Sequence, residues 1–457
     1  MSLINKNNKV NVLTLLTLSA ALLLTACGGS SSNDIPPLFY EFKDLKLTLE
    51  DIEAPRLALG HNHTCFITSD EQVKCWGDNA KGQLGNGAIT KKELENDHHN
   101  GDITQKEYET QKNQLFSNVP VSVENIVNAT QVSSAENHTC ALLSDGTIKC
   151  WGDNAKGQLG NSDLGNTVPN QPKDNDSASA IPVLVNVDSL DKKDKATAIS
   201  VSGSYSCGIF ETNGVQCWGE TPKGFDADNL KSVSNLNPVQ LATSYGYNRS
   251  GFACAVTGDN TIQCWGNSIY LGQAEGSPLV YDINNALHVS NQGAHTCALL
   301  DTGRVKCWGY NPSGQVGVEP GSEAKNNGIY MPNLLNRIGE VTSLSAAGNN
   351  TCAVTQRGSV ECWGANSGGQ LGYLPPEKNS QNSHINYYSS SPKVIELLSK
   401  FEAAEVAVGQ SHICARLTND ELYCWGKNDR GQLGNGEKLS DGNSNLSTLS
   451  TPVKVQL

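Results

Sequence analysis

The sequence predicts an all-β fold built from seven repeats, each with the four strands of one propeller blade. Fourteen of the 15 cysteines fall into seven pairs, with nine residues between the members of each pair. All seven tryptophans directly follow the second cysteine of a pair and precede a glycine. A fixed internal period determines the whole architecture, so it is interpreted before any other feature. The 44 glycines and the 6% aromatic content also suit a turn-rich β protein.

Each cysteine pair spans a predicted hairpin. In the second repeat, residues 139–143 and 147–152 are short strands that flank the turn 144–146. The odd loop length centred on the pair places its cysteines opposite each other on one face, about 4.5–5.5 Å apart and within disulfide range. Seven disulfides within repeats are therefore predicted, each contributing roughly 2–3 kcal/mol. They join Cys65 with Cys75, Cys140 with Cys150, Cys207 with Cys217, Cys254 with Cys264, Cys297 with Cys307, Cys352 with Cys362, and Cys414 with Cys424.

Two further points concern these hairpins. Zinc is the alternative use of paired cysteines, but zinc ligands are separated by two to four residues and a secreted protein favours disulfides, so no metal site is expected.

The third turn position of each hairpin requires a positive φ, and all but one of its seven occupants tolerate that conformation. These occupants are Glu71, Gly146, Asn213, Asn260, Gly303, Gly358 and Asp420.

A second signature follows each Trp-Gly pair. Residues 78–85 read Asp-Asn-Ala-Lys-Gly-Gln-Leu-Gly and recur identically at 153–160. Close variants lie at 310–317, 365–372 and 427–434, and the third and fourth repeats are degenerate there. A strand that begins with proline comes next, and a further strand enters the next cysteine, which completes the four strands of a blade. The proline-led strands begin at Pro120, Pro182, Pro238, Pro392 and Pro452, and the last is expected to complete the blade begun at 57–59 and so close the ring.

These motifs, Gly-x-x-His-Thr-Cys, Asp-Gly, Cys-Trp-Gly-x-Asn and Gly-Gln-Leu-Gly, resemble the regulator of chromosome condensation repeat. The resemblance covers roughly residues 56–457, with five strong and two weakened repeats, and it implies a seven-bladed β-propeller there. The eukaryotic namesake promotes nucleotide exchange on a small nuclear GTPase and contacts chromatin, but no residue here matches its exchange wedge. Similar secreted bacterial propellers act as protein binders, including a β-lactamase inhibitor, so the resemblance implies binding without naming a partner.

The first 26 residues resemble a lipoprotein signal peptide. Lys6 and Lys9 precede an apolar run over 10–24, which is too short for a spanning helix and is followed by small residues. Leu-Thr-Ala-Cys at 24–27 resembles the bacterial lipobox, whose cysteine is acylated; the alternative is an ordinary signal peptide with a chance cysteine. Cys27 is therefore expected to carry a lipid, and 27–55 to form a flexible tether. Gly28, rather than Asp, follows the cysteine, and by resemblance to sorted bacterial lipoproteins this favours the outer membrane, with the protein facing the periplasm or the cell surface.

The charge balance excludes some functions. The chain has 33 Lys and Arg against 46 Asp and Glu, a net charge of −13, whereas binding to nucleic-acid phosphates needs a basic surface. No nucleophile–base motif, phosphate-binding loop or recurring carboxylate pair is recognisable. The sequence therefore predicts no catalytic residue, no cofactor and no nucleic-acid partner, and membrane contact through the lipid alone.

Four histidines share one repeat position, two residues before the first cysteine. A ring of ligands in the central channel is one interpretation, and hydrogen bonding to a neighbouring blade is the favoured one. Tyr205, Phe252 and Asn350 replace the histidine elsewhere. The four are His63, His138, His295 and His412.

An insertion at residues 88–118 interrupts the first repeat. Thr90 and Thr104 each precede a glutamate by three residues, which is a helix-capping pattern, so a helical hairpin is expected. It resembles a short oligomerisation-type module with Gly-x-Ile-Thr-x-x-Glu-Tyr. Calcium is the open alternative, because six residues match EF-hand loop positions, although His98 is a poor ligand for a hard cation. These six are Asn96, His98, Asn100, Gly101, Asp102 and Glu107.

The sequence thus favours a noncatalytic module that binds a protein or a glycan outside the cytoplasm while anchored by a lipid. An enzyme of the lyase or hydrolase type, with a pocket on one propeller face, is the alternative from another class. A cluster of His, Asp and Arg at one channel mouth would support it. Guanine-nucleotide exchange, inherited from the family name, is the third possibility and fits an acidic exported protein poorly.

Overall fold

The computed structural model describes residues 46–457 except 89, 113–114, 162–177, 187–193, 224, 226–233, 236, 245–250, 267–270, 274–278, 322–327, 374–386 and 438–447. The expected signal peptide, the lipidation site Cys27 and the tether as far as residue 45 lie outside the described residues. No helix among the described residues is long and apolar enough to cross a membrane.

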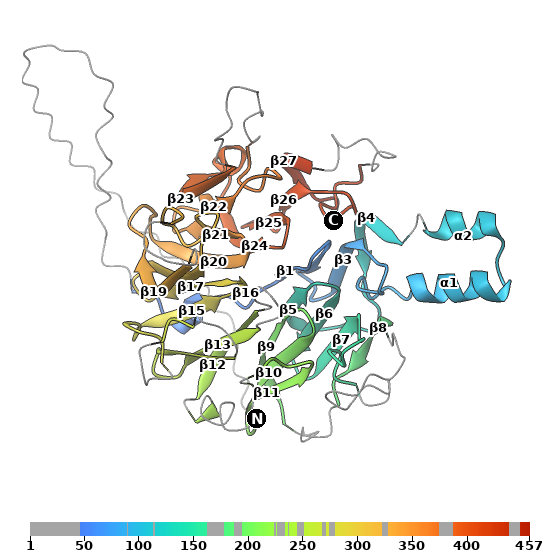
Figure 1. Ribbon diagram of the computed structural model, residues 1–457, viewed down its shortest axis with the longest axis horizontal. Helices are drawn as coiled ribbons and strands as arrows, with labels where there is room; N and C mark the ends of the chain where they lie inside the picture. The colour runs from blue at the N-terminus through green and yellow to red at the C-terminus, as the bar shows by residue number, and fades with distance from the viewer. Residues whose placement is uncertain are drawn as a thin grey trace, which may run out of the picture. The chain divides into compact units, whose positions relative to one another are not determined.

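Seven antiparallel sheets form a propeller ring around a central channel (Figure 1), as the sequence predicts. The first blade contains β1 (Leu57–Leu59), β2 (His63–Ile67), β3 (Val73–Asp78) and β4 (Phe116–Ser122). The second contains β5 (Ala129–Ala135), β6 (His138–Leu143), β7 (Ile148–Gly152) and β8 (Ser179–Leu184). The described strands of the third are β9 (Ala196–Val201), β10 (Tyr205–Phe210) and β11 (Gly214–Gly219). Those of the fourth are β12 (Pro238–Ser244), β13 (Phe252–Thr257) and β14 (Ile262–Gly266).

The remaining three blades follow the same order from the channel outward. The fifth contains β15 (Ala286–Ser290), β17 (His295–Leu300), β18 (Val305–Tyr310) and β19 (Gly328–Leu334). The sixth contains β20 (Val341–Gly348), β21 (Asn350–Thr355), β22 (Val360–Ala365) and β23 (Tyr388–Val394), and β16 (Gln292–Gly293) pairs with β20 in parallel. The seventh contains β24 (Ala403–Val408), β25 (His412–Leu417), β26 (Leu422–Lys427) and β27 (Thr448–Lys454).

The disulfides lie where the hairpin spacing predicts them. In each blade the two cysteines are paired residues of the second and third strands, and their Cα atoms are 4.0–4.1 Å apart. This distance is slightly shorter than the predicted 4.5–5.5 Å. In blade order the bonds join Cys65 with Cys75, Cys140 with Cys150, Cys207 with Cys217, Cys254 with Cys264, Cys297 with Cys307, Cys352 with Cys362, and Cys414 with Cys424.

The turns of these hairpins also follow the prediction, with one exception. The positive φ at the third turn position is found in six repeats, for example 61° at Glu71 and 64° at Asp420. In the third repeat the expectation was wrong by one residue, because the positive φ falls on Gly214 instead of Asn213. Glycine adopts this conformation without a steric cost, so it takes the position from its neighbour.

The proline-led strands differ from the prediction in their starts and in their places. Only Pro238 begins its strand, and the other four prolines lie three or four residues after the strand start. The strand β27, which contains Pro452, pairs with β26 of its own blade, so it does not complete the blade that starts at residues 57–59. Pro238 begins the innermost strand of the fourth blade, whereas Pro120, Pro182 and Pro392 lie in outermost strands. Proline lacks a donor N–H, so it suits the free edge of an outer strand and discourages pairing with another chain.

Contacts between side chains close the ring between the seventh and first blades. Among the described residues, no strand of one blade completes the sheet of the other. His412 Nε2 lies 2.8 Å from the Thr64 hydroxyl, and the Trp76 indole donates to the Gln432 carbonyl at 2.9 Å. The core at this junction also contains Leu57 and Leu433. Similar apolar clusters lie between the other blades, so each blade buries its faces against its two neighbours.

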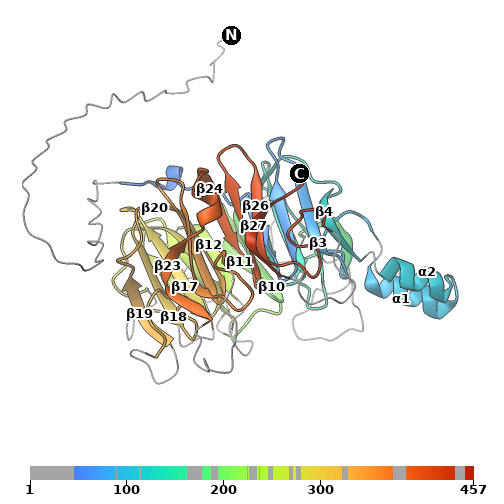
Figure 2. The same ribbon diagram turned by 90° about the horizontal axis from the view of Figure 1, so that it is seen from above.

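The insertion in the first blade is a helical hairpin, as expected. It consists of α1 (Lys91–Asn100) and α2 (Gln105–Lys112). Thr90 and Glu93 form a full capping box, and Thr104 and Glu107 make the corresponding hydrogen bonds. Both views show the hairpin extending sideways from the rim of the ring (Figure 2).

The two faces of the ring carry different connections. The four strands of a blade alternate in direction, so the connection from its first to its second strand and the connection from its third to its fourth strand emerge on the same face of the ring. We call these the first and third connections. We call this face the insertion face, because α1 and α2 belong to the third connection of the first blade. The second connections, and those between successive blades, emerge on the other face. Residues 46–55 also lie there, because the Leu47 N–H donates to the carbonyl of Asp301 in the second connection of blade five. We call it the N-terminal face.

Candidate functional site

The four repeat histidines are structural links between blades and form no ligand ring. The Nε2 atom of each lies 2.8–3.0 Å from a hydroxyl oxygen of the next blade, which belongs to Thr139, Ser206, Thr351 or Thr64. The favoured interpretation of these residues is therefore confirmed. Among the residues that the structure describes, no three His, Cys, Asp or Glu side chains are grouped so that they could hold a metal ion.

Burial favours the neutral form of these histidines, and the hydroxyl partner of His412 defines its tautomer. The Thr64 hydroxyl donates to the Gln432 carbonyl, so it accepts its second bond from a protonated Nε2 of His412. Burial lowers the pKa of His63, His138 and His412 to about 3 and that of His295 to about 4. A buried, neutral imidazole with one hydrogen bond fixes the spacing of two blades and is a poor acid or base catalyst near neutral pH.

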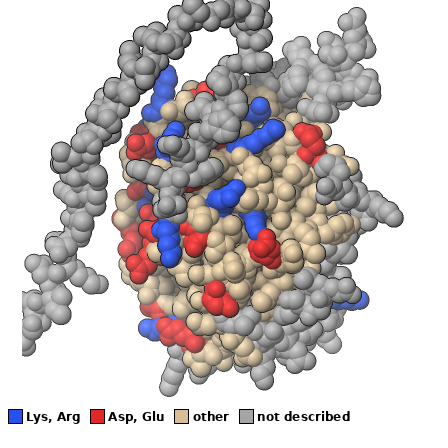
Figure 3. All heavy atoms as spheres, turned by 90° about the vertical axis from the view of Figure 1, so that its left-hand side faces the viewer, with Lys and Arg blue, Asp and Glu red and all other residues tan. Residues whose placement is uncertain are grey.

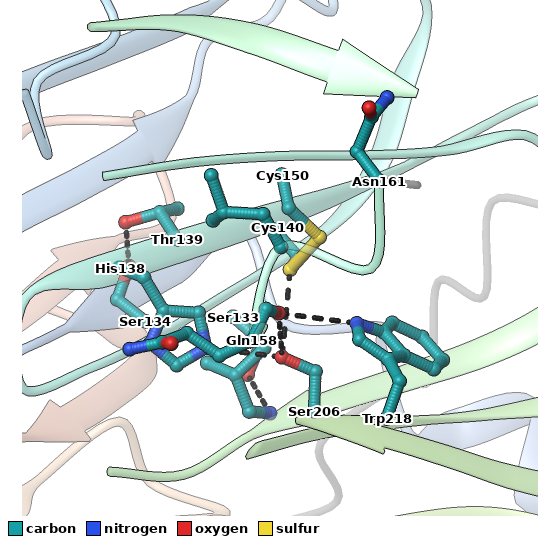
Figure 4. The surroundings of a disulfide bond; sticks show 12 residues. Ser133, Ser134, His138, Thr139, Cys140, Cys150, Gln158, Asn161, Ser206 and Trp218 are labelled. Atoms are coloured by element: carbon teal, nitrogen blue, oxygen red, sulfur yellow. Dashed lines mark hydrogen bonds between the residues drawn. A yellow bond between two sulfur atoms is a disulfide. The ribbon is translucent and has the colours of Figure 1, made fainter. Parts of the chain in front are cut away.

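The Gly-Gln-Leu-Gly signature forms the second link between blades (Figure 4). Trp218 of the third blade donates to the Gln158 carbonyl of the second at 3.1 Å, and the Ser206 hydroxyl donates to the same carbonyl at 2.9 Å. Equivalent tryptophan bonds of 2.8–2.9 Å occur in four other blades. The motif therefore positions one carbonyl that accepts from the tryptophan of the following blade, and at Gln158, Gln315 and Gln432 the same carbonyl also accepts from a hydroxyl of that blade.

The link is missing where the motif is degenerate. The indole nitrogens of Trp265 and Trp308 are buried and have no hydrogen-bond partner within the described residues. These tryptophans follow the third and fourth repeats, the two in which Gly-Gln-Leu-Gly is not recognisable. A buried unpaired donor costs about 1–3 kcal/mol, so the junctions of the fourth blade are weaker than the others.

The calcium alternative is wrong for the helical hairpin. Asn96, His98 and Asn100 lie within α1, so they do not belong to a loop that could wrap a cation. Glu107, the expected last ligand, accepts hydrogen bonds from the backbone and hydroxyl of Thr104. Gly101 has the left-handed conformation of a helix C-terminus, with φ 81°. The similarity to an EF-hand loop thus arises from helix-capping residues.

Residues 46–55 close one end of the channel. The sequence assigned them to the tether, but Glu53 contacts the buried Arg416 guanidinium at 2.6 Å, and Ile52 packs on the core between blades five and six. Arg416 also binds Glu405 and Asp420. Glu405 in turn accepts from the backbone N–H groups of residues 56 and 57. The last ten residues of the expected tether are therefore fixed to the propeller.

The channel behind this segment contains a cavity and a side chain that crosses it. A cavity of about 260 Å³ lies between residues 51–55 and the inner strands of the seven blades. At its other end the Gln292 side chain, from β16 near the centre of the ring, crosses to the second blade and donates to the Ser134 carbonyl at 2.8 Å (Figure 1). Gln292 lines both this cavity and the larger pocket on the far side of the ring, so it lies where the two meet.

The insertion face carries the candidate site, an open mouth of about 510 Å³. Its wall consists mainly of first connections, around His61, Glu136, Gln292, Asn349 and Gln410. The third connections of blades five and six complete it. Sequence reasoning missed these residues because they lie outside the repeat motif and differ from blade to blade.

With this geometry established, the sequence can be compared with known proteins. Models of the regulator of chromosome condensation (RCC1) repeat match residues 56–83, 129–158, 293–315 and 403–432, and also 70–142, 357–416 and 419–457. The chain is a seven-bladed propeller of these repeats. It belongs to the RCC1 repeat family.

A solved structure of similar fold is Prp20p from Saccharomyces cerevisiae. It matches with a TM-score of 0.64 and 18% identity over 91% of this chain and 90% of Prp20p. The yeast protein bound to Kap60 matches with the same TM-score. At this identity the likeness establishes the fold alone.

Sequence relatives include the probable E3 ubiquitin-protein ligase HERC4 of Rattus norvegicus, which is 28% identical over 79% of this chain and 31% of the ligase. Protein pim1 of Schizosaccharomyces pombe is 25% identical over 86% of this chain and 63% of its own length. The ultraviolet-B receptor UVR8 of Arabidopsis thaliana is 25% identical over 84% and 66%. The chain thus spans about a third of the HERC4 ligases.

Charged groups are arranged for stability in the described part of the molecule. At the N-terminal face Arg56, Arg416, Glu53, Glu405 and Asp420 form one ion-pair network. A charged cluster at a channel mouth is the feature expected of the enzyme alternative. The carboxylates of this cluster, however, are already paired with guanidinium groups. On the side of the ring seen in Figure 3, Lys and Arg alternate with Asp and Glu and form no continuous basic surface there.

Proposed function

We propose that the protein is a noncatalytic, protein-binding propeller outside the cytoplasm, held to the outer membrane by a lipid on Cys27. The single observation that carries this proposal is the asymmetry of the ring. The open mouth and the helical hairpin share the insertion face, whereas residues 46–55 cover the channel at the other face. Variable connections on a rigid scaffold are a common place for binding residues.

Similar propellers support a protein partner in general terms. The yeast propeller was crystallised with Kap60, and Prp20p was studied for binding to Gsp1p and histones. These particular partners are not carried over, because an acidic chain with a signal-peptide-like N-terminus is poorly suited to chromatin or to a cytoplasmic GTPase. The HERC4 ligases are much longer than this chain, so their ligase activity is not inferred either.

The expected anchor joins the propeller from its N-terminal face. The described chain starts at this face, where the Leu47 N–H donates to the Asp301 carbonyl at 2.7 Å. A lipid on Cys27 would therefore attach the protein to the membrane through a connection that leaves the insertion face uncovered. Replacement of Cys27 by serine should abolish labelling by a palmitate analogue and release the protein from the membrane fraction. Retained labelling would contradict the proposed anchor.

Photo-crosslinking on intact cells tests the binding face. A photoreactive residue is introduced at Gln410 or Asn349, both exposed on the insertion face, or at the exposed Asp70 or Glu402 on the N-terminal face as matched controls. The first pair should give a discrete protein adduct that the controls do not give. An adduct from the controls alone, or none from either pair, would refute the proposed face.

A further inference from the structure

The mouth on the insertion face is almost uncharged although the chain has a net charge of −13. Glu136 is the only carboxylate and His61 the only basic side chain among its described lining residues. The other polar groups are amides and hydroxyls, and several glycines expose backbone on the wall. The mouth therefore offers hydrogen bonds without a field that would select an ion.

Four amide side chains of this wall are held at one end only. Gln292 donates to Ser134, and Asn350 donates to the Ala365 carbonyl at 2.7 Å. The oxygen of Gln370 accepts from its own loop at 2.8 Å, and that of Asn349 accepts from a glutamine side chain at 3.2 Å. Within the described residues, the other end of each amide has no protein partner. These groups are preorganised, which reduces the entropy lost when a ligand binds.

One part of the wall is apolar. Tyr310 ends β18 and is half-buried, and Pro312 follows it in the third connection of blade five. The exposed Gln410 belongs to the same mouth. An aromatic ring with a polar tip, beside amides that both donate and accept, matches a ligand with an apolar face and a rim of hydroxyl groups.

We propose that this mouth binds an uncharged sugar, with the sugar-ring C–H face against Tyr310 and its hydroxyls on Gln292, Asn349, Gln370 and Gln410. The volume of about 510 Å³ lies within the range of small-ligand pockets, ~300–1,000 Å³. Sugar hydroxyls donate and accept at once, as do the amides. An acidic sugar is disfavoured because Glu136 is a carboxylate and no Lys or Arg is among the described lining residues to pair with a second anion.

This inference deepens the proposed function, because it assigns a ligand class to the same face. Saturation-transfer difference NMR on the full-length protein in nanodiscs tests it with maltotriose, cellotriose, chitotriose and trigalacturonate as probes. At least one neutral trisaccharide should show saturation of its ring protons and a measurable affinity, and trigalacturonate should show neither. Absence of transfer to all three neutral probes, or equal binding of trigalacturonate, would overturn the proposal.

Variants locate the site. Tyr310→Ala and Gln410→Ala should each weaken binding about tenfold, and Tyr310→Phe should largely preserve it. Tyr281→Ala removes an aromatic ring that is 54% exposed on the opposite face and should change nothing. Unchanged affinity in Tyr310→Ala would refute this location. If photo-crosslinking at Gln410 yields no protein but the sugar still binds, the protein-binding proposal fails and the sugar site stands.

Discussion

Acidification should destabilise the propeller well before its carboxylates titrate. His63, His138, His295 and His412 are fully buried, and burial lowers the pKa of each from 6.5 to about 3 or 4. Below pH 6.5 the unfolded chain binds protons at these histidines and the folded chain does not, so the free energy of unfolding falls with pH. At pH 5.5 each histidine should remove roughly 1–2 kcal/mol and the four together about 5 kcal/mol relative to pH 7.5.

Urea unfolding of the full-length, oxidised protein, followed by tryptophan fluorescence, measures this loss. Burial also raises the pKa of Asp78, Glu361 and Glu405, and these carboxyls offset part of the loss because they bind protons more readily in the folded state than in the unfolded chain. Burial lowers the pKa of His288 to about 4 as well, so it adds a similar loss. His412→Asn should lower stability at pH 7.5 and reduce the pH dependence by about a fifth. Asparagine is chosen because Asn350 occupies this position in the sixth repeat. His99→Asn, on the exposed surface of α1, makes the same change at an exposed histidine and is the control. Equal unfolding midpoints at pH 7.5 and 5.5 would refute the burial argument.

Three other changes test the links that hold the ring. Mass spectrometry after alkylation should find no free thiol among the fourteen repeat cysteines, and the double change Cys140→Ala, Cys150→Ala should cost about 2–3 kcal/mol in urea unfolding. Gly434→Ala should cost about 2–4 kcal/mol, because φ is +65° and an added Cβ would lie 2.7 Å from the indole nitrogen of the first blade. Arg416→Ala should cost about 3–5 kcal/mol, because it leaves Glu405 buried and unpaired.

Matched variants separate these effects from general damage. Gly101→Ala has a similar φ, +81°, but its added Cβ would meet nothing within 4 Å. The difference from Gly434→Ala therefore isolates the contact with the next blade. Lys91 forms an exposed pair on α1, so Lys91→Ala should change stability by less than about 0.5 kcal/mol and serves as the control for Arg416→Ala. Equal losses within either pair would contradict the corresponding contact.

Local chemistry explains which parts of the fold could be predicted. Cysteine spacing, turn residues and helix caps act within about ten residues, so the hairpins, the disulfides and the helical insertion followed from the sequence. The assignment of strands to blades did not, because a strand between two hairpins can pair with either. Pro238 and Pro452 show this limit: they occupy similar sequence positions, yet one begins an innermost strand and the other lies in an outermost strand.

The end of the channel near the N-terminus was missed for a different reason. Residues 46–55 carry no repeat signal, and their position depends on contacts with Asp301, Arg416 and the core between blades five and six. These partners are about 245 or more residues away in the sequence. No local pattern encodes such a contact, so a tether was the natural expectation.

The repeat motif and most of the candidate site use different residues, and this separation limits what family membership can reveal. Gln370 belongs to both, because its carbonyl accepts from the Trp425 indole while its side chain lines the mouth. The cysteines, tryptophans, histidines and the Gly-Gln-Leu-Gly carbonyls are engaged between or within blades, so they are largely unavailable to a ligand. Gln292, Asn349 and Gln410 lie at positions that vary among the repeats, and they face an open mouth. A change in ligand therefore requires no change in the links that hold the ring. For this reason, the residues that identify the family predict its fold. The ligand specificity of this member depends on the connections between its strands.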